Sequence, residues 1–179
     1  SGNSNVTYTE KDYYAGKRDL GYLVPTPLPH SFKSAPSFND PKLSRQWLFK
    51  DAVKHGISVS KAYSENISTP QKEIIEAVVD TGVDYNHEDL KEVMWVNAGE
   101  IPGNGIDDDA NGYIDDIHGI NTLVRDSNGN ATVNMMDGHS HGSHVSGIIG
   151  AKQNNGKGIA GIASNVRIMG IRTVPNSAD

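Results

Sequence analysis

The sequence predicts an α/β domain with a doubly wound, mainly parallel sheet, because of the order and composition of its segments. Two short apolar runs rich in β-branched residues, 73–80 and 165–174, have the composition of buried parallel strands. Between them, residues 136–151 place Val145, Ile148 and Ile149 at helical spacing. Strand, acidic insertion, helix and strand follow in the βαβ order of such folds.

Composition sets limits on the class of protein. The 179 residues are 36% hydrophobic, which suffices for one ordinary core, so one domain is expected. The absence of cysteine excludes disulfides and a thiolate zinc site, and the net charge of -6 argues against nucleic acid or an anionic membrane as a partner. No apolar run is long enough to span a membrane, and no signal pattern opens the chain, so we expect any targeting segment to have been removed before Ser1.

The chain divides at about residue 38. Residues 1–38 are polar, rich in Tyr, Pro and Ser and without periodicity, which predicts an extended arm or a propeptide-junction segment. Residues 39–179 are the predicted folded domain, with an acidic insertion at 98–119. Within this domain Ser58, as an N-cap, predicts a short amphipathic helix over Ser58–Tyr63.

Asp80 and His141 could form a catalytic pair, although an Asp at the end of a strand is more often a cap or turn residue. Asp80 ends the first predicted strand, where open α/β sheets place functional residues, and His141 lies at the start of the predicted helix. A hydroxyl nucleophile needs a neutral imidazole to take its proton, and that imidazole needs a carboxylate to fix its tautomer. In such a pair Asp80 would accept a hydrogen bond from one ring nitrogen of His141. Gly147 and Gly150 are poor helix formers, which predicts that this helix packs closely against the sheet.

Two sequence blocks carry a family resemblance. AVVDTGVDYNHEDL, residues 77–90, resembles the aspartate motif of the subtilisin-like serine proteases (subtilases), and HGSHVSGIIGA, residues 141–151, resembles their histidine motif. The resemblance implies a subtilisin-like fold, with Asp80 as the orienting acid and His141 as the general base. The order of the two agrees with the Asp-before-His order of the subtilisin triad. The resemblance gives His144 no catalytic role.

A different hydrolase is the first alternative. GHSHG, residues 138–142, matches the G-x-S-x-G nucleophile elbow of the α/β-hydrolases, with Ser140 as the nucleophile. That fold needs an acid and a His after the serine, and beyond His144 the chain has no His and only Asp179.

A zinc hydrolase is the second alternative. His139, His141 and His144 give the pattern H-x-H-x-x-H, whose nitrogens could bind zinc. Ser143, however, stands where the metallo-β-lactamase-like pattern has Asp.

The acidic insertion predicts a calcium site. Its residues 107–112 reproduce D-x-[DN]-x-[DN]-G, in which alternate oxygen side chains face one centre and the glycine permits a sharp turn. His118 replaces the usual Glu at the twelfth position and the flanks are not helical, so this is an EF-hand-like loop outside an EF-hand. Five aspartates within ten residues would repel one another without a cation, which favours calcium over a solvated acidic turn. The predicted ligands are the side chains of Asp107, Asp109, Asn111 and Asp115 and the carbonyl oxygen of Tyr113.

The resemblance also implies a second calcium site. In many subtilases an N-terminal Gln, an Asp nine residues after the catalytic Asp and an Asn-containing loop after the histidine helix share one ion. The matching residues here are Gln46, Asp89 and either Asn154 or Asn155. The loop QNNGKG is one residue longer than the common pattern, and its Asn and Gly residues also suit a simple turn.

The sequence lacks the third member of a triad. The resemblance covers roughly residues 39–174, and no G-T-S-M-[AS] motif with a nucleophilic serine is present. We therefore expect a doubly wound sheet that is incomplete without a downstream segment, with Val166, Ile168, Ile171 and Val174 of the last strand left without their covering neighbours.

The sequence predicts the N-terminal part of a calcium-dependent serine endopeptidase that acts on peptides or proteins. The expected partner is the C-terminal portion of the same protease, carrying the serine as a second chain, and the expected location is secreted or extracellular, including the cell surface. The alternative from another functional class is a non-catalytic, calcium-binding interaction module derived from a subtilase.

Overall fold

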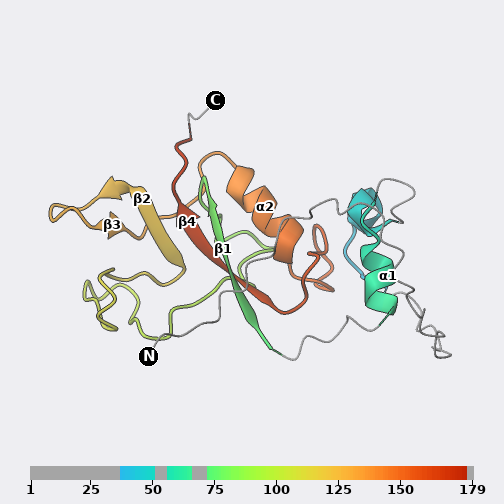
Figure 1. Ribbon diagram of the computed structural model, residues 1–179, viewed down its shortest axis with the longest axis horizontal. Helices are drawn as coiled ribbons and strands as arrows, with labels where there is room; N and C mark the ends of the chain where they lie inside the picture. The colour runs from blue at the N-terminus through green and yellow to red at the C-terminus, as the bar shows by residue number, and fades with distance from the viewer. Residues whose placement is uncertain (1–36, 51–55, 66–71, 177–179) are drawn as a thin grey trace, which may run out of the picture. The chain divides into compact units, whose positions relative to one another are not determined.

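The computed structural model describes residues 37–50, 56–65 and 72–176 (Figure 1). The predicted arm at residues 1–38 therefore lies outside the described residues except for its last two. The helical elements are η1 (Leu43–Arg45), η2 (Trp47–Phe49), α1 (Val59–Ser64) and α2 (His141–Gly150), and the strands are β1 (Ile74–Asp80), β2 (Gly119–Arg125), β3 (Ala131–Thr132) and β4 (Val166–Arg172).

The strands form a four-stranded sheet in the order β1-β4-β2-β3, mostly parallel (Figure 1). β4 pairs in parallel with β1 on one side and with β2 on the other, and β3 pairs antiparallel with β2. Because α2 precedes β4 in the chain and packs against both β1 and β4, the predicted βαβ order and the α/β class are confirmed. β2 and β3 were not predicted.

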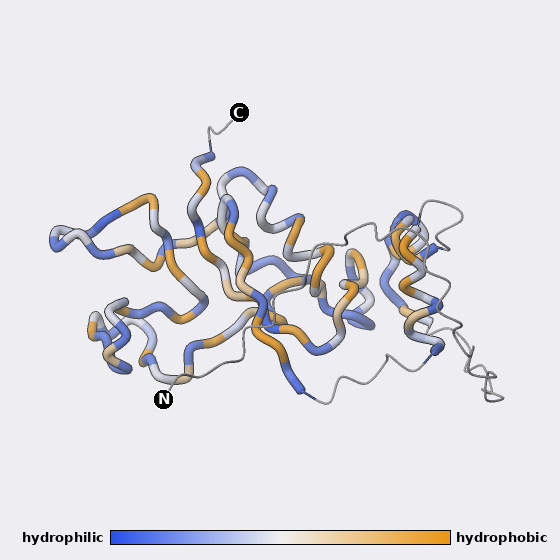
Figure 2. Tube along the Cα trace, in the orientation of Figure 1, coloured by the Kyte–Doolittle hydropathy of each residue, from blue (hydrophilic) through white to orange (hydrophobic). Residues whose placement is uncertain are grey.

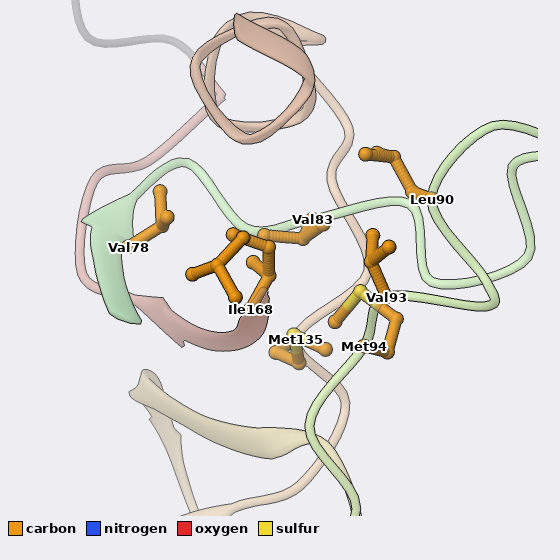
Figure 3. Close-up of a cluster of buried hydrophobic side chains, with 8 residues drawn as sticks. Val78, Val83, Leu90, Val93, Met94, Met135 and Ile168 are labelled. Carbon is orange, nitrogen blue, oxygen red and sulfur yellow. The ribbon is translucent and has the colours of Figure 1, made fainter. Parts of the chain in front are cut away.

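The main core lies on one face of the sheet. Val78 of β1 and Ile168 of β4 meet residues of the 83–94 segment and Met135, as Figure 3 shows. Hydrophobic residues run along both β1 and β4 (Figure 2). Such apolar and β-branched residues favour strands that are buried on at least one face.

Helix α2 approaches the sheet through small residues. Its buried positions are Gly142, Ser146, Gly147 and Gly150. A Cβ on Gly150 would collide with Cγ1 of Val166 in β4, which confirms the predicted close packing at that position. A Cβ on Gly147 would make only an ordinary 3.4 Å contact with Ile159, which lies in a loop, so the prediction does not hold for Gly147.

The predicted short helix exists as α1, which begins at Val59 directly after Ser58. It belongs to a second apolar cluster that contains Phe38, Phe49 and Val59. The hydroxyl of Tyr63 donates a 2.6 Å hydrogen bond to the carbonyl of Ile162, which ties α1 to the segment before β4. In the part of the chain that the structure describes, no helix has the length and apolar character needed to cross a membrane.

The sequence predicted that the apolar residues of the last strand would lack covering neighbours, and this prediction is wrong for two of them. Val166 and Ile168 were expected to lack cover, but they are 8% and 0% exposed because the main core covers them. The open surface belongs mainly to β1, where Ile75 is 52% and Val79 is 60% exposed. Side chains of a strand alternate between faces, so these two residues lie on the face opposite Val78 and the main core.

Candidate active site

Asp80 and His141 lie in direct contact. Nδ1 of His141 is 2.8 Å from Oδ1 and 2.9 Å from Oδ2 of Asp80. Since an ionised carboxylate can only accept, Nδ1 carries the proton and donates it. The imidazole side chain is 60% exposed and the carboxylate 17%, so the histidine faces outward from a more protected aspartate. The hydrogen bond expected from the sequence is present.

The two residues meet because of where their elements end and begin. Asp80 is the last residue of β1, and His141 is the first of α2. Gly82 (φ 110°) turns the chain after β1. A Cβ on Gly142 would collide with the carbonyl of Gly82 and stand 3.1 Å from Cβ of Asp80, so only glycine lets the helix start this close to the strand end.

The pKa of Asp80 is lowered from its ordinary value of 3.8. Burial alone would raise this pKa, but the N–H of Thr81 and the ring of His141 donate hydrogen bonds to the carboxylate and together outweigh that effect. Asp80 is therefore ionised near neutral pH, as a residue that orients and stabilises an imidazolium must be.

Asp137 is a functional candidate that the sequence interpretation missed. Its carboxylate accepts hydrogen bonds from the hydroxyl of Thr81, at 2.9 Å, and from groups at the start of α2. The sequence contains no signal for it, because the N-cap position of α2 is Ser140 and Asp137 lies three residues earlier, outside the position where capping residues are expected.

The structure does not favour either alternative for the histidine-rich stretch. A nucleophile elbow joins a strand directly to a helix, whereas Ser140 follows the irregular segment 133–139. For zinc, the three histidines would have to converge. Within the described residues, only Glu100, Asp109 and Asp116 form a group of three or more such ligands with atoms within 4.8 Å of one another.

The acidic insertion folds around its own carboxylates. Asp107 and Asp109, two predicted calcium ligands, both accept hydrogen bonds of 3.0 Å from the backbone N–H of Asn111. The N–H of Tyr113 donates to the side chain of Asn111 at 2.8 Å. Asp115 accepts instead from the backbone N–H groups of residues 103, 104 and 105. Asp107, Asp109 and Asn111 therefore lie together, as the loop pattern predicts, whereas Asp115 binds the backbone of residues 103–105.

Glu100 and Asp116 were not among the predicted ligands, yet they converge with Asp109. Both are nearly buried, at 7% and 6% exposure, and the amide of Asn97 donates to Asp109 and to Asp116 at 2.9 and 2.8 Å. Glu100 precedes the loop pattern, so the pattern could not predict it as a ligand. Asp116 follows Asp115, the residue that the pattern assigns to its ninth position, and the pattern itself gives Asp116 no role.

Of the residues of the second predicted calcium site, the structure joins Asp89 to Asn155 by a hydrogen bond, while the side chain of Gln46 bonds a different residue. The amide of Asn155 donates to Asp89 at 2.8 Å, and the side chain of Gln46 bonds both backbone groups of Ala160. The backbone N–H of Asn154 instead donates to Asp40, a buried carboxylate that the sequence interpretation did not assign.

Comparison with known proteins agrees with this geometry. The family model described as the subtilase family matches residues 71–179. Subtilisin-like protease 1 of Plasmodium berghei is 40% identical over 136 residues, which are 74% of this chain and 20% of that protein. A thermophilic serine proteinase of Bacillus sp. (strain AK1) is 37% identical over 98 residues, which are 55% of this chain and 18% of that protein.

Among solved structures, a protease from Pseudoalteromonas arctica PAMC 21717 has a similar fold, with a TM-score of 0.50 and 22% identity over 78% of this chain and 40% of that one. The chain spans about a fifth of the length of the curated relatives it matches.

Proposed function

This chain belongs to the subtilase family, and on that premise we propose that it supplies the acid–base pair of a serine endopeptidase whose nucleophile lies in another segment of the enzyme. The observation that carries the proposal is the hydrogen bond between Nδ1 of His141 and the carboxylate of Asp80, which leaves Nε2 to act as the base. The relatives are named as proteases, which supports peptide or protein substrates.

In this proposal Nε2 of His141 takes the proton from a serine hydroxyl as the oxygen attacks the peptide carbonyl carbon. Asp80 stabilises the imidazolium that forms, without itself becoming protonated. The imidazolium then gives its proton to the leaving amine, and the resulting acyl-enzyme is hydrolysed by water in the reverse sequence of proton transfers.

We extend the proposal to a structural calcium ion in the acidic insertion. The convergence of Glu100, Asp109 and Asp116 supports it, because carboxylate oxygens are the ligands that Ca²⁺ prefers and three such groups repel one another without a cation. The ion would hold the loop together and neutralise its charge. A secreted or extracellular location is part of the same proposal.

The test uses the complete protease that contains this chain. Asp80→Asn and His141→Ala should each lower kcat on peptide substrates by roughly 10,000-fold or more, the order of loss seen when triad members are removed. Ser140→Ala is the matched control, since Ser140 adjoins His141 in the chain, and it should retain activity.

Labelling with a fluorophosphonate gives a second readout. We expect one serine outside residues 1–179 to be labelled, and we expect the His141→Ala variant to lose the label. A label on Ser140 would establish the α/β-hydrolase alternative. A complete protein that neither hydrolyses peptides nor reacts with the probe would establish the non-catalytic binding module.

A further inference from the structure

We infer that Asp137 is a positioning residue, which acts through the hydroxyl of Thr81 to hold the start of α2, and with it His141, in register with Asp80. The inference rests on the proposed function, since the pair that it positions is the proposed acid–base pair. Asp137 itself touches neither Asp80 nor His141 through any hydrogen bond of the described structure.

Asp137 accepts more hydrogen bonds than a helix cap requires. An N-cap side chain usually accepts from one backbone N–H of the first turn. Here Oδ1 accepts from the backbone N–H of His139 and of Ser140 at 2.9 and 2.8 Å, and Oδ2 accepts from both the N–H and the hydroxyl of Ser143 at 2.8 and 2.7 Å. The carboxylate therefore fixes the chain on both sides of His141.

Thr81 extends this network to the strand. Its hydroxyl donates to Oδ1 of Asp137 at 2.9 Å and accepts from the backbone N–H of Gly142 at 3.0 Å. Its own backbone N–H donates to Oδ1 of Asp80 at 2.7 Å. Thr81 thus links both halves of the pair: its backbone N–H bonds Asp80, and its side-chain hydroxyl bonds Gly142, the residue after His141.

The direction of these hydrogen bonds depends on the charge of Asp137. A hydroxyl has one proton to donate, and a backbone N–H can only donate, so the hydroxyl of Thr81 must give its proton to Asp137 while it accepts from Gly142. An ionised carboxylate accepts all five bonds. An amide in its place would turn an NH₂ group toward at least one donor and disrupt either the Thr81 bond or the Ser143 bonds.

The environment keeps Asp137 ionised. Burial alone would raise its pKa, but the hydroxyl and N–H of Ser143, the N–H of His139 and the hydroxyl of Thr81 lower the pKa from 3.8 to about 2. The acceptor is therefore charged over the whole range in which a neutral imidazole can serve as a base.

The space around this network allows little adjustment. Gly142 already contacts the carbonyl of Gly82 closely, so the start of α2 cannot move nearer to the strand end. A loss of the Thr81 bond would let it move only outward, which lengthens the contact between Asp80 and His141. Misplacement of about 1 Å at a reacting group can cost on the order of 100-fold in rate.

The experiment compares Asp137→Asn, Thr81→Val and Thr81→Ser in the complete protease, at a temperature well below the melting point of each variant. Asp137→Asn and Thr81→Val should each lower kcat by roughly 10- to 100-fold with KM changed by less than about threefold, because they misalign the base without touching the substrate. Thr81→Ser keeps the hydroxyl, so this variant should retain most of the kcat of the parent protease. The double variant Asp137→Asn/Thr81→Val should be scarcely worse than either single one, since both break the same network.

Asp126→Asn is the matched control. Asp126 also accepts backbone N–H groups in a turn, from Asn128 and Asn130, but it lies in the connection between β2 and β3. This variant should leave kcat unchanged. A second readout is the NMR signal of the Nδ1 proton of His141, which should shift or broaden in Asp137→Asn and remain in place in Asp126→Asn.

Two results would overturn the inference: an unchanged kcat in Asp137→Asn while Asp80→Asn is inactive, or an equal loss of kcat in Asp126→Asn. If instead Asp80→Asn itself retains full activity, the proposed acid–base pair is wrong, and that outcome is distinct from a failure of the positioning role.

Discussion

At the scale of single residues, three aspartates of this chain show how hydrogen-bond donors decide what a carboxylate does. Asp80, Asp126 and Asp137 all have lowered pKa values. Asp126 closes the turn between β2 and β3, while Asp137 joins the start of α2 to Thr81 after β1. Asp80 shares its oxygens between Thr81 and His141. Only the last arrangement directs a carboxylate at a titratable base.

The lowered pKa of Asp137 predicts an acid-dependent loss of stability. Its folded pKa of about 2 lies below the ordinary 3.8, so its contribution is complete above about pH 4 and is lost as the pH falls toward 2. The size is on the order of 1–2 kcal/mol once solvent screening at a half-buried group is allowed for. Urea unfolding between pH 2 and 6, in a His141→Ala background that prevents autolysis, should show Asp137→Asn to be less stable at pH 6 and less pH-dependent below pH 4. Parallel curves for the two proteins would contradict this assignment.

At the scale of elements, the acidic insertion is a segment in which side-chain carboxylates bond much of the local backbone. Glu100 accepts backbone N–H groups of Asp108, Asp109 and Asp115, so one side chain organises the loop. This arrangement gathers negative charge at one place, and the gathered charge is what a cation would stabilise.

The element-scale prediction is that calcium removal lowers the melting temperature of the complete protease. An ion bound only by the folded state at 100 times its Kd contributes about 2.7 kcal/mol, which corresponds to a fall of roughly 5 °C or more on adding excess chelator. Asp116→Asn and Glu100→Gln should abolish the response to chelator. Asp115→Asn should retain it if the converging triad binds the ion and lose it if the EF-hand-like pattern does. A melting temperature that chelator leaves unchanged in the parent protein would argue against calcium in this loop.

Sequence patterns predicted the elements whose causes are local. The β-branched runs predicted β1 and β4, and the helical spacing after His141 predicted α2, because in each case the signal lies within the segment itself. β2 was missed because it depends on a distant partner: Gly119 lies directly against the carbonyl of Gly170, an approach that no local pattern encodes.

The candidate site shows the same division. Motif resemblance singled out Asp80 and His141, and the structure brings them together. Asp137 was missed because its partner Thr81 lies 56 residues away in the sequence, and Glu100 because it lies outside the pattern that the loop matches. Residues that act through long-range hydrogen bonds leave no periodic signal.

At the scale of the whole molecule, the sheet is covered on one face by α2 and the main core, while apolar residues remain open on the other. Parallel sheets occur almost only with both faces covered, since their strands are apolar on both sides. Ile75 and Val79 at 52% and 60% exposure therefore require cover, as do the half-buried Met169 and Ile171 of β4 beside them. We propose that the remainder of the catalytic domain supplies that cover, which agrees with the share of its relatives that this chain spans.

The last prediction tests that cover with a charge placed on the open face. In the complete protease, Val79→Asp should lower the free energy of unfolding by about 2–4 kcal/mol, because the carboxylate would be buried without a partner. Ile57→Asp is the matched control, since Ile57 is equally exposed at 60% but lies outside the sheet, just before Ser58 and α1, and it should change stability by less than about 1 kcal/mol. In the chain of residues 1–179 alone, the same substitution should be favourable. The unmodified chain should self-associate through its apolar face, as measured by sedimentation velocity, and Val79→Asp should reduce that association. A chain that is monomeric on its own, together with a Val79→Asp variant of unchanged stability in the complete protease, would show that this face is a free surface of the protein.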